Sequence, residues 1–143
     1  MTERVNNNFL VEAAEEGNFE KAKTLIEAGA DVDFKNVFGE PALSIASYWG
    51  YIDIVKLLIE NGANVNPRNM RGDTPLIDAA TCGHYDVAEF LIKSGADTHV
   101  TNELGCTAIM QACGRDHEDI ATLIIHHENR NDNKGENHEH RSI

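Results

Sequence analysis

Glycine recurs in this chain at a fixed interval of 33 residues, and this periodicity limits the possible folds more than any other feature does. Three separate series follow the interval, and they are Gly17, Gly50 and Gly83; Gly29, Gly62 and Gly95; and Gly39, Gly72 and Gly105. Agreement among three independent series is not a product of chance. The chain therefore consists of repeated structural units.

Apolar residues keep the same interval as the glycines. Their series are Leu10, Leu43, Leu76 and Ile109; Ala13, Ala46, Ala79 and Ala112; Leu25, Leu58, Leu91 and Ile124; and Ile26, Ile59, Ile92 and Ile125. In the second unit, the spacing of Ile54, Val55, Leu58 and Ile59 places these side chains on one stripe of a helix. Such a stripe requires a neighbouring element to cover it.

Each unit is predicted to be a pair of helices joined by a tight turn. In the second unit a short helix begins near Ala42, Gly50 lies between the two helices, and Gly62 follows the second helix. Glycine ends a helix in the left-handed backbone conformation without the steric cost of a Cβ atom. In the third unit Thr74 supplies a capping hydroxyl, and Pro75 follows at the first helical position.

The third unit also carries a recognisable pattern. It reads Gly72-Asp73-Thr74-Pro75-Leu76-Ile77-Asp78-Ala79-Ala80, then Gly83-His84, Leu91-Ile92 and Gly95-Ala96-Asp97. With the 33-residue period, this pattern resembles the ankyrin repeat over about residues 6 to 127. The resemblance implies an all-α ankyrin-repeat solenoid of stacked helix-turn-helix units, with short β-hairpin fingers at residues 31–39, 64–72 and 97–105. Fingers and short helices would together line a concave face.

Four units, at about residues 6–34, 35–67, 68–100 and 101–127, are expected to make up a repeat domain of residues 1–127. The first and fourth units resemble caps, since the first lacks a preceding finger and the fourth has Asp116 and Glu128 at glycine positions. The second unit has Pro41-Ala42 where the family prefers Thr-Pro, so its threonine cap is lost. Residues 128–143 are polar, and we expect a disordered tail there because few apolar groups offset the entropy of ordering.

Composition indicates an intracellular, cytoplasmic protein that binds neither nucleic acid nor membrane. The formal net charge of -12 at pH 7 repels polyanions and would attract a basic partner, although acidity equally serves solubility alone. Three cysteines without a C-x-x-C pair fit free thiols in a reducing compartment, and Cys113 is expected in the core at a small alanine position. The polar start and the short apolar runs predict neither a signal peptide nor a membrane span.

The resemblance also implies where a partner binds, because ankyrin proteins use positions that the repeat leaves free. These positions flank the fingertip glycine and precede the glycine between the helices. The candidate partner-binding residues are Val37, Phe38, Glu40, Tyr48, Trp49, Met70, Arg71, Asp73, Asp78, Thr81, Cys82, Glu103, Leu104 and Arg115.

Phe38, Tyr48 and Trp49 are expected at the centre of the concave surface, where aromatic side chains have the character of interface hot spots. The alternative is that Tyr48 and Trp49 fold back onto neighbouring short helices as structural packing. Asp78 is interpreted equally well as a solvated residue or as a specific ion-pairing residue.

These observations predict a protein-protein interaction module with an acidic, aromatic-centred concave groove, acting as an adaptor, an inhibitor or a neutralising protein. It is expected to be monomeric when unbound and to need no cofactor. The alternatives are a structural spacer, or weak metal binding by the tail histidines His126, His127, His138 and His140.

Catalysis is disfavoured by the sequence. No G-x-S-x-G or H-E-x-x-H motif occurs, and an open solenoid lacks the closed, desolvated pocket that active sites need. His84 and His117 are expected to support the loops rather than to react. Asp33, Asn66 and His99 occupy a position that is hydroxylated in some eukaryotic relatives, and nothing in the sequence shows such an enzyme to be present.

Overall fold

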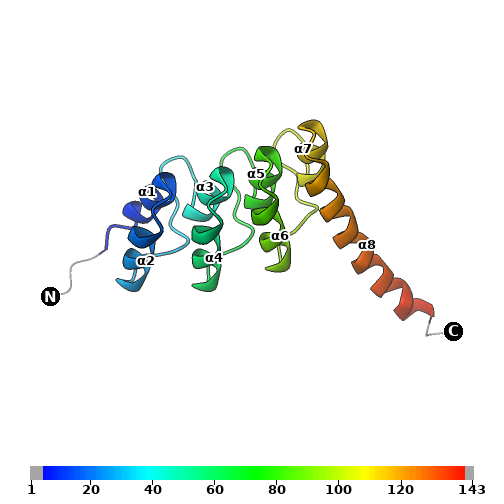
Figure 1. Ribbon diagram of the computed structural model, residues 1–143, viewed down its shortest axis with the longest axis horizontal. Coiled ribbons are helices and arrows are strands. Elements are labelled where there is room, and N and C mark those ends of the chain that lie inside the picture. Colours follow the sequence, from blue (N-terminus) through cyan, green and yellow to red (C-terminus); the bar gives the residue numbers. More distant parts are fainter. Residues whose placement is uncertain (1–4, 141–143) are drawn as a thin grey trace.

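The computed structural model describes residues 5–140, with side chains described up to residue 132. Within this range the chain forms helices only, apart from one isolated β-bridge between Lys35 and Pro41. The helices, shown in Figure 1, are α1 (Asn8–Glu16), α2 (Phe19–Glu27), α3 (Ala42–Trp49), α4 (Ile52–Glu60), α5 (Pro75–Cys82), α6 (Tyr85–Lys93), α7 (Ala108–Gly114) and α8 (Glu118–His140).

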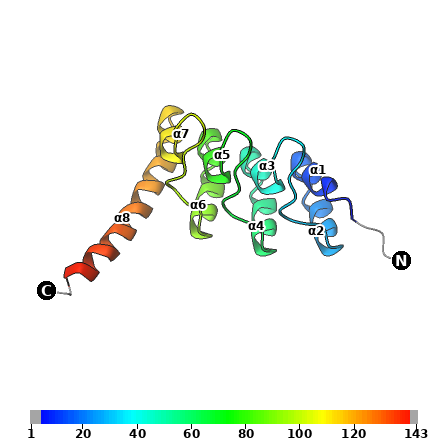
Figure 2. The ribbon, with the colours of Figure 1, turned by 180° about the vertical axis from the view of Figure 1, so that it is seen from behind.

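The helices stand in two parallel rows, which the views from the front and from behind both show (Figures 1 and 2). The first helices of the units, α1, α3, α5 and α7, pack side by side in one row, and α2, α4, α6 and α8 form the other. Each helix also packs against its partner in the same unit. The predicted all-α solenoid of helical hairpins is confirmed.

The core runs lengthwise between the two rows. Leu10, Leu43 and Leu76 repeat at the same place in successive units, and each is about 1% exposed. Leu58, Leu91 and Ile124 form a matching series on the second helices and are fully buried. Burying a side chain of this size contributes about 1.5–3 kcal/mol, so the periodic residues hold neighbouring units together.

The turns between paired helices depend on glycine for two reasons. Gly50 has a φ of 79°, and a Cβ atom there would lie 2.6 Å from the ring of His84 in the next unit. The His84 Nε2 atom lies 2.9 Å from the Tyr48 carbonyl oxygen, so His84 supports this turn as expected. In the fourth unit Asp116 keeps the left-handed conformation with a φ of 63°, which costs about 1–2 kcal/mol in a residue with a Cβ atom.

Threonine caps two of the first helices, and the second unit lacks one as its sequence predicts. The Thr74 hydroxyl accepts a hydrogen bond from the Ile77 amide at 3.2 Å, and Thr107 does the same for Met110 at 3.3 Å. Pro41 stands at the N-cap of α3 and provides no such bond.

Helix α8 runs from Glu118 to His140, so its backbone continues past residue 127. The domain boundary at residue 127 and the tail of residues 128–143 stay predictions. Extending an existing helix adds one backbone hydrogen bond for each residue that is fixed, which favours continuation once the first turn has formed. The expected tail residues 141–143 lie outside the described residues.

The three cysteines are free thiols, as expected, but Cys113 is not in the core. Ala14 and Ala80 are its counterparts in other units, and both are buried because the next unit covers them. Cys113 lies on the last of the first helices and is exposed, so the expectation of a core position was wrong. Among the described residues, no helix is both long enough and apolar enough to cross a membrane.

Candidate functional site

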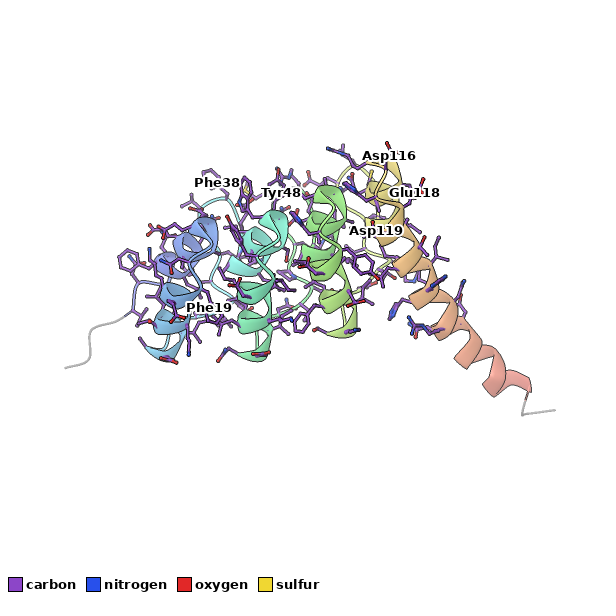
Figure 3. The ribbon with its side chains drawn as sticks, in the orientation of Figure 1. Phe19, Phe38, Tyr48, Asp116, Glu118 and Asp119 are labelled. Atoms are coloured by element: carbon purple, nitrogen blue, oxygen red, sulfur yellow. The ribbon has the colours of Figure 1, made fainter. Side chains whose placement is uncertain are left out.

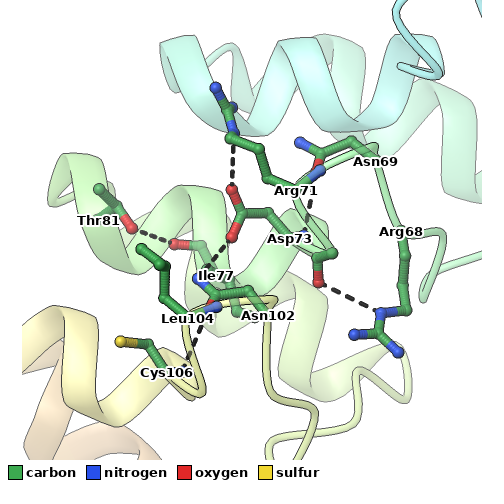
Figure 4. Close-up of polar contacts among 10 residues, drawn as sticks. Arg68, Asn69, Arg71, Asp73, Ile77, Thr81, Asn102, Leu104 and Cys106 are labelled. Carbon is green, nitrogen blue, oxygen red and sulfur yellow. Dashed lines mark hydrogen bonds and ion pairs between the residues drawn. The ribbon is translucent and has the colours of Figure 1, made fainter.

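The predicted fingers are tight turns that one asparagine side chain holds in each case. The Asn69 Oδ1 atom accepts hydrogen bonds from the Arg71 amide at 2.9 Å and from the Asp73 amide at 3.0 Å (Figure 4). Asn36 and Asn102 repeat this arrangement in the neighbouring fingers. Backbone bonds close each finger as well, since the Asn69 amide donates to the Asp73 carbonyl oxygen at 3.1 Å and the Gly72 amide donates to the Asn69 carbonyl oxygen at 2.9 Å. The β-hairpins that we expected are not shown, because the described residues contain one isolated β-bridge, Lys35 with Pro41, and no strand.

Neighbouring fingers are bonded to one another. Arg68 Nη2 donates to the Thr101 carbonyl oxygen at 2.6 Å, and the Glu103 amide donates to the Arg71 carbonyl oxygen at 3.0 Å. Lys35 reaches the Arg68 carbonyl oxygen at 3.3 Å in the same way. These bonds hold the side chains of successive fingers at fixed positions above the first helices.

A pocket of about 240 Å³ opens between α3 and α5, and we call it the Asp78 pocket. Side chains from one finger, the next finger and both helices surround it. They are Glu40, Ser44, Ile45, Tyr48, Trp49, Arg71 and Asp78.

A second hollow of about 420 Å³ lies between α5 and α7, and we call it the Arg115 hollow. It is lined by Tyr48, Arg71, Asp73, Asp78, Thr81, Asn102, Glu103, Leu104, Gln111 and Arg115. Because Tyr48, Arg71 and Asp78 line both hollows, the two spaces adjoin. We refer to the two adjoining hollows together as the groove.

Tyr48 and Trp49 form an aromatic pair at the end of α3. Their ring centroids lie 5.2 Å apart with the planes at 83°, an edge-to-face contact that is favourable for aromatic rings. Tyr48 is 42% exposed and Trp49 is 55% exposed, so both rings keep a large free surface. Figure 3 shows Tyr48 and Phe38 on the side of the fingers and first helices, whereas Phe19 lies on the row of second helices.

Asp78 lies at the wall shared by the two hollows and is 5% exposed, so it is not a solvated surface residue. Its side chain has no hydrogen bond or ion pair with any described residue. Burial raises the pKa of Asp78 from its ordinary 3.8 to about 8, Asp73 and Glu40 raise the pKa as well, and Arg71 lowers it. Asp78 is therefore a buried, uncompensated acid.

Asp73, unlike Asp78, accepts hydrogen bonds from neighbouring side chains. Its Oδ2 atom accepts from Arg71 Nε at 3.2 Å, and its Oδ1 atom accepts from Asn102 Nδ2 at 2.9 Å (Figure 4). Arg71 is thus tethered to the finger, with 67% of its side chain exposed. The ion-pairing role that we considered for Asp78 belongs to Asp73.

Most of the candidate residues lie along the groove. Glu40, Tyr48, Trp49, Arg71 and Asp78 meet in the Asp78 pocket, and Asp73, Thr81, Glu103, Leu104 and Arg115 line the Arg115 hollow. Val37, Phe38 and Met70 stand at the fingertips with most of their surface exposed, and they line neither hollow. Cys82 is half-buried and lines neither, and burial raises the pKa of its thiol, with Asp78 as the second cause.

Two kinds of groove residue were missed by the sequence reasoning. Ser44 and Ser47 are buried hydroxyls without a hydrogen-bond partner, and Ser44 lines the Asp78 pocket. The signal was present, because Ser44 occupies the repeat position of the apolar residues Val11 and Ile77. The asparagines that hold the fingers were missed as well, although they follow the 33-residue interval.

The remaining candidate positions show structural contacts. Asp33 Oδ1 accepts from the Asn64 amide at 2.8 Å, and Asn66 Oδ1 accepts from the Asp97 amide at 2.9 Å, so both join consecutive units. The His99 Nδ1 atom lies 3.8 Å from the Glu128 Oε1 atom. No metal-binding group of three or more His, Cys, Asp or Glu residues occurs among the described side chains, and His138 and His140 lie outside them.

Comparison with known proteins agrees with the repeat architecture. A family model described as "Ankyrin repeats (3 copies)" matches residues 10–102. A Drosophila melanogaster protein named "DNA replication inhibitor plutonium" is 43% identical over 49 residues. This match covers 34% of the present chain and 28% of that relative, so the chain spans less than a third of the relative's length.

Proposed function

The chain belongs to the ankyrin-repeat family, and from that premise we propose that it binds another protein in the concave groove and acts by masking a surface of that partner. Protein-protein interaction is the activity that this family implies. The observation that carries the proposal is the exposed aromatic pair of Tyr48 and Trp49 beside the Asp78 pocket. Large aromatic side chains next to a pocket are typical of the few residues that supply most binding energy.

Rigidity of the groove supports binding without turnover. The fingers are held by asparagine side chains and by bonds between fingers, and α3 and α5 have a first helix packed on each side. A surface that is already ordered loses little entropy when a partner binds. We propose a monomeric, non-enzymatic module that engages its partner stoichiometrically.

The charge of the groove supports a partner with a basic surface. The chain carries a formal net charge of -12, and Glu40, Asp73, Asp78 and Glu103 all line the two hollows. Electrostatic complementarity of this kind speeds association and selects against acidic partners. A reducing, cytoplasmic location is part of the proposal, and the three free thiols support it.

Masking a partner's surface would inhibit that partner. The name of the Drosophila relative describes an inhibitor of DNA replication. We propose an inhibitor or adaptor role for this chain, in which the bound groove masks a partner's surface. We also propose that the repeat domain ends near residue 127 and that the polar end of α8 takes no part in the groove.

Affinity capture from native lysate tests the groove. The bait is the intact chain, compared with the triple variant Phe38→Ala, Tyr48→Ala, Trp49→Ala. A matched control is the double variant Phe9→Ala, Tyr85→Ala, because Phe9 is 45% and Tyr85 is 38% exposed and neither lines the two hollows. We expect one partner to be lost with the triple variant and kept with the control. A partner that the folded triple variant still captures would place binding elsewhere on the molecule.

A further inference from the structure

Two buried polar groups in the Asp78 pocket lack partners. The Ser44 hydroxyl on α3 is 2% exposed and makes no hydrogen bond, and the Asp78 carboxyl on α5 is 5% exposed and makes none among the described residues. An unsatisfied buried polar group costs about 1–3 kcal/mol. Nothing in the packing of α3 and α5 uses these groups, so a ligand that donates hydrogen bonds would relieve both.

Ser44 is polar where its repeat counterparts are apolar. Val11 and Ile77 occupy the same repeat position in the neighbouring units, and both are buried apolar residues. An apolar residue at position 44 would fill the space without an unpaired hydroxyl. The polar Ser44 therefore lines a pocket that the buried Asp78 also lines.

The walls of the pocket favour a cation with a flat face. Tyr48 and Trp49 line one side with exposed ring surface, and aromatic faces attract guanidinium and ammonium groups. Glu40 lines the pocket too and forms no ion pair with any described residue. Arg71 is the positive group already present, but its Nε atom is bonded to Asp73.

We propose that the Asp78 pocket binds one arginine side chain of the protein partner, with the guanidinium between Asp78, Glu40 and the Ser44 hydroxyl and its flat face on one ring of the aromatic pair. This inference rests on the proposed function and names the anchor residue of the partner. Arginine fits better than lysine because its planar fork presents five donors to separated acceptors and stacks on rings. The volume of about 240 Å³ accommodates one long side chain, below the about 300–1,000 Å³ of sites for drug-sized ligands.

Occupancy by a cation would be linked to pH. Asp78 carries a pKa of about 8 when the pocket is free, mainly because of burial and also because Asp73 and Glu40 are near. The charged and titratable groups around Asp78 from the packed elements are Glu40, Tyr48, Arg71, Asp73, Cys82, Glu103 and Arg115. A bound guanidinium lowers the pKa of Asp78 and releases its proton. Affinity for arginine therefore rises with pH up to about 8 and then levels off.

Titration of the isotope-labelled full chain with acetyl-Ala-Arg-Ala-amide, followed by nuclear magnetic resonance, tests the pocket. We expect saturable shifts of the amides of residues 44–49 and of Asp78, with a dissociation constant on the order of a few millimolar. The neutral analogue acetyl-Ala-citrulline-Ala-amide has the same shape and should bind about tenfold more weakly. Equal binding of the two peptides, shifts spread over the whole acidic surface, or no shifts would overturn the proposal.

Variants separate the pocket from general acidity. Asp78→Asn keeps the shape of a side chain that is mostly protonated at neutral pH, and it should weaken arginine binding about fivefold or more at about pH 8.5 and remove its pH dependence. Ser44→Ala tests the orphan hydroxyl in the same titration. The control Glu27→Gln removes one exposed charge from α2 and should leave binding unchanged. Unchanged affinity in folded Asp78→Asn contradicts the proposal.

Binding of the captured partner to the variants tests the arginine pocket and the groove separately. If Phe38→Ala, Tyr48→Ala, Trp49→Ala abolishes capture and Asp78→Asn leaves the affinity of the partner intact, the groove is correct and the arginine pocket is wrong. If the arginine peptide binds as expected while the triple variant retains the partner, the pocket stands as a cation site and the groove is not the partner's site.

Discussion

The carboxyl group of Asp78 is buried where its charged form is disfavoured, so the free energy of unfolding of the protein should depend on pH. Its pKa is about 8 in the folded chain and near 3.8 when the chain is unfolded. Between these values the folded state holds a proton that the unfolded state has released. The contribution of Asp78 is therefore fully favourable at low pH, falls as pH rises toward about 8, and is constant above it.

Asp78→Asn should remove this dependence, because an amide does not titrate. Denaturant unfolding of both proteins between about pH 5 and about pH 8.5 measures it. We expect the free energy of unfolding of the wild-type chain to fall, relative to the variant, by an amount on the order of a few kcal/mol across this range. Parallel curves for the two proteins would mean that Asp78 is not the buried acid that the structure describes.

Asp78 also illustrates what a single sequence leaves open at this scale. Its place on the concave side followed from the repeat, because every unit places the same positions there. Its burial did not follow, since Asp78 lies among residues such as Arg71 and Tyr48, which come from a finger and from another unit's helix. Ser44 was missed for a related reason: a polar residue at an apolar repeat position has meaning only once the pocket beside it is known.

Among the helices that follow a finger, α3 is the one whose N-terminal amides receive no side-chain hydrogen-bond acceptor. Pro41 precedes it and offers no side-chain acceptor, whereas Thr74 and Thr107 cap α5 and α7. The backbone of Pro41 has a φ of -80° and a ψ of 164°, close to the values of -90° and 171° at Thr107. Threonine therefore fits position 41 without a change of backbone conformation.

Pro41→Thr should create the missing cap, and Pro41→Val is the matched control because valine has the same shape without the hydroxyl. Thr107-Ala108 in this chain already shows the dipeptide that Pro41→Thr would form with Ala42. We expect the threonine variant to be more stable than the valine variant by about 1 kcal/mol in thermal or denaturant unfolding. Equal stabilities would show that the start of α3 gains nothing from a hydroxyl acceptor.

At the level of elements, the periodicity predicted nearly everything that regular packing determines. Helix starts near Ala42 and Pro75 and the turns at Gly50 and Gly62 are where the spacing placed them. In the fingers, the side chains of Asn36, Asn69 and Asn102 add hydrogen bonds to the backbone bonds that close each turn, and the spacing alone did not indicate them. Helix α8 continues past residue 127 because helix continuation depends on backbone bonds within the helix, whereas composition reports burial.

The whole molecule is a row of units in which each contacts its neighbours, so the same substitution should act differently along the row. Leu10 and Leu76 hold the same repeat position and are equally buried. Leu76 lies on α5, which packs against α3 and α7, whereas Leu10 lies on α1, which packs against α3 alone among the first helices. Stability in such arrays is the sum of unit stabilities and of nearest-neighbour contacts.

Leu76→Ala should lower the free energy of global unfolding by about 2–5 kcal/mol, because it opens a cavity in a central unit that packs against a unit on each side. Leu10→Ala should instead loosen the first unit while the centre stays folded. Native-state hydrogen exchange distinguishes them: the amides of α1 and α2 should lose protection in Leu10→Ala, and those of α5 and α6 should keep it. If Leu10→Ala lowers protection uniformly, the array unfolds as one unit. If protection is lost only at the end, the Asp78 pocket lies in the most stable part of the molecule, where a rigid groove is best preserved for a partner.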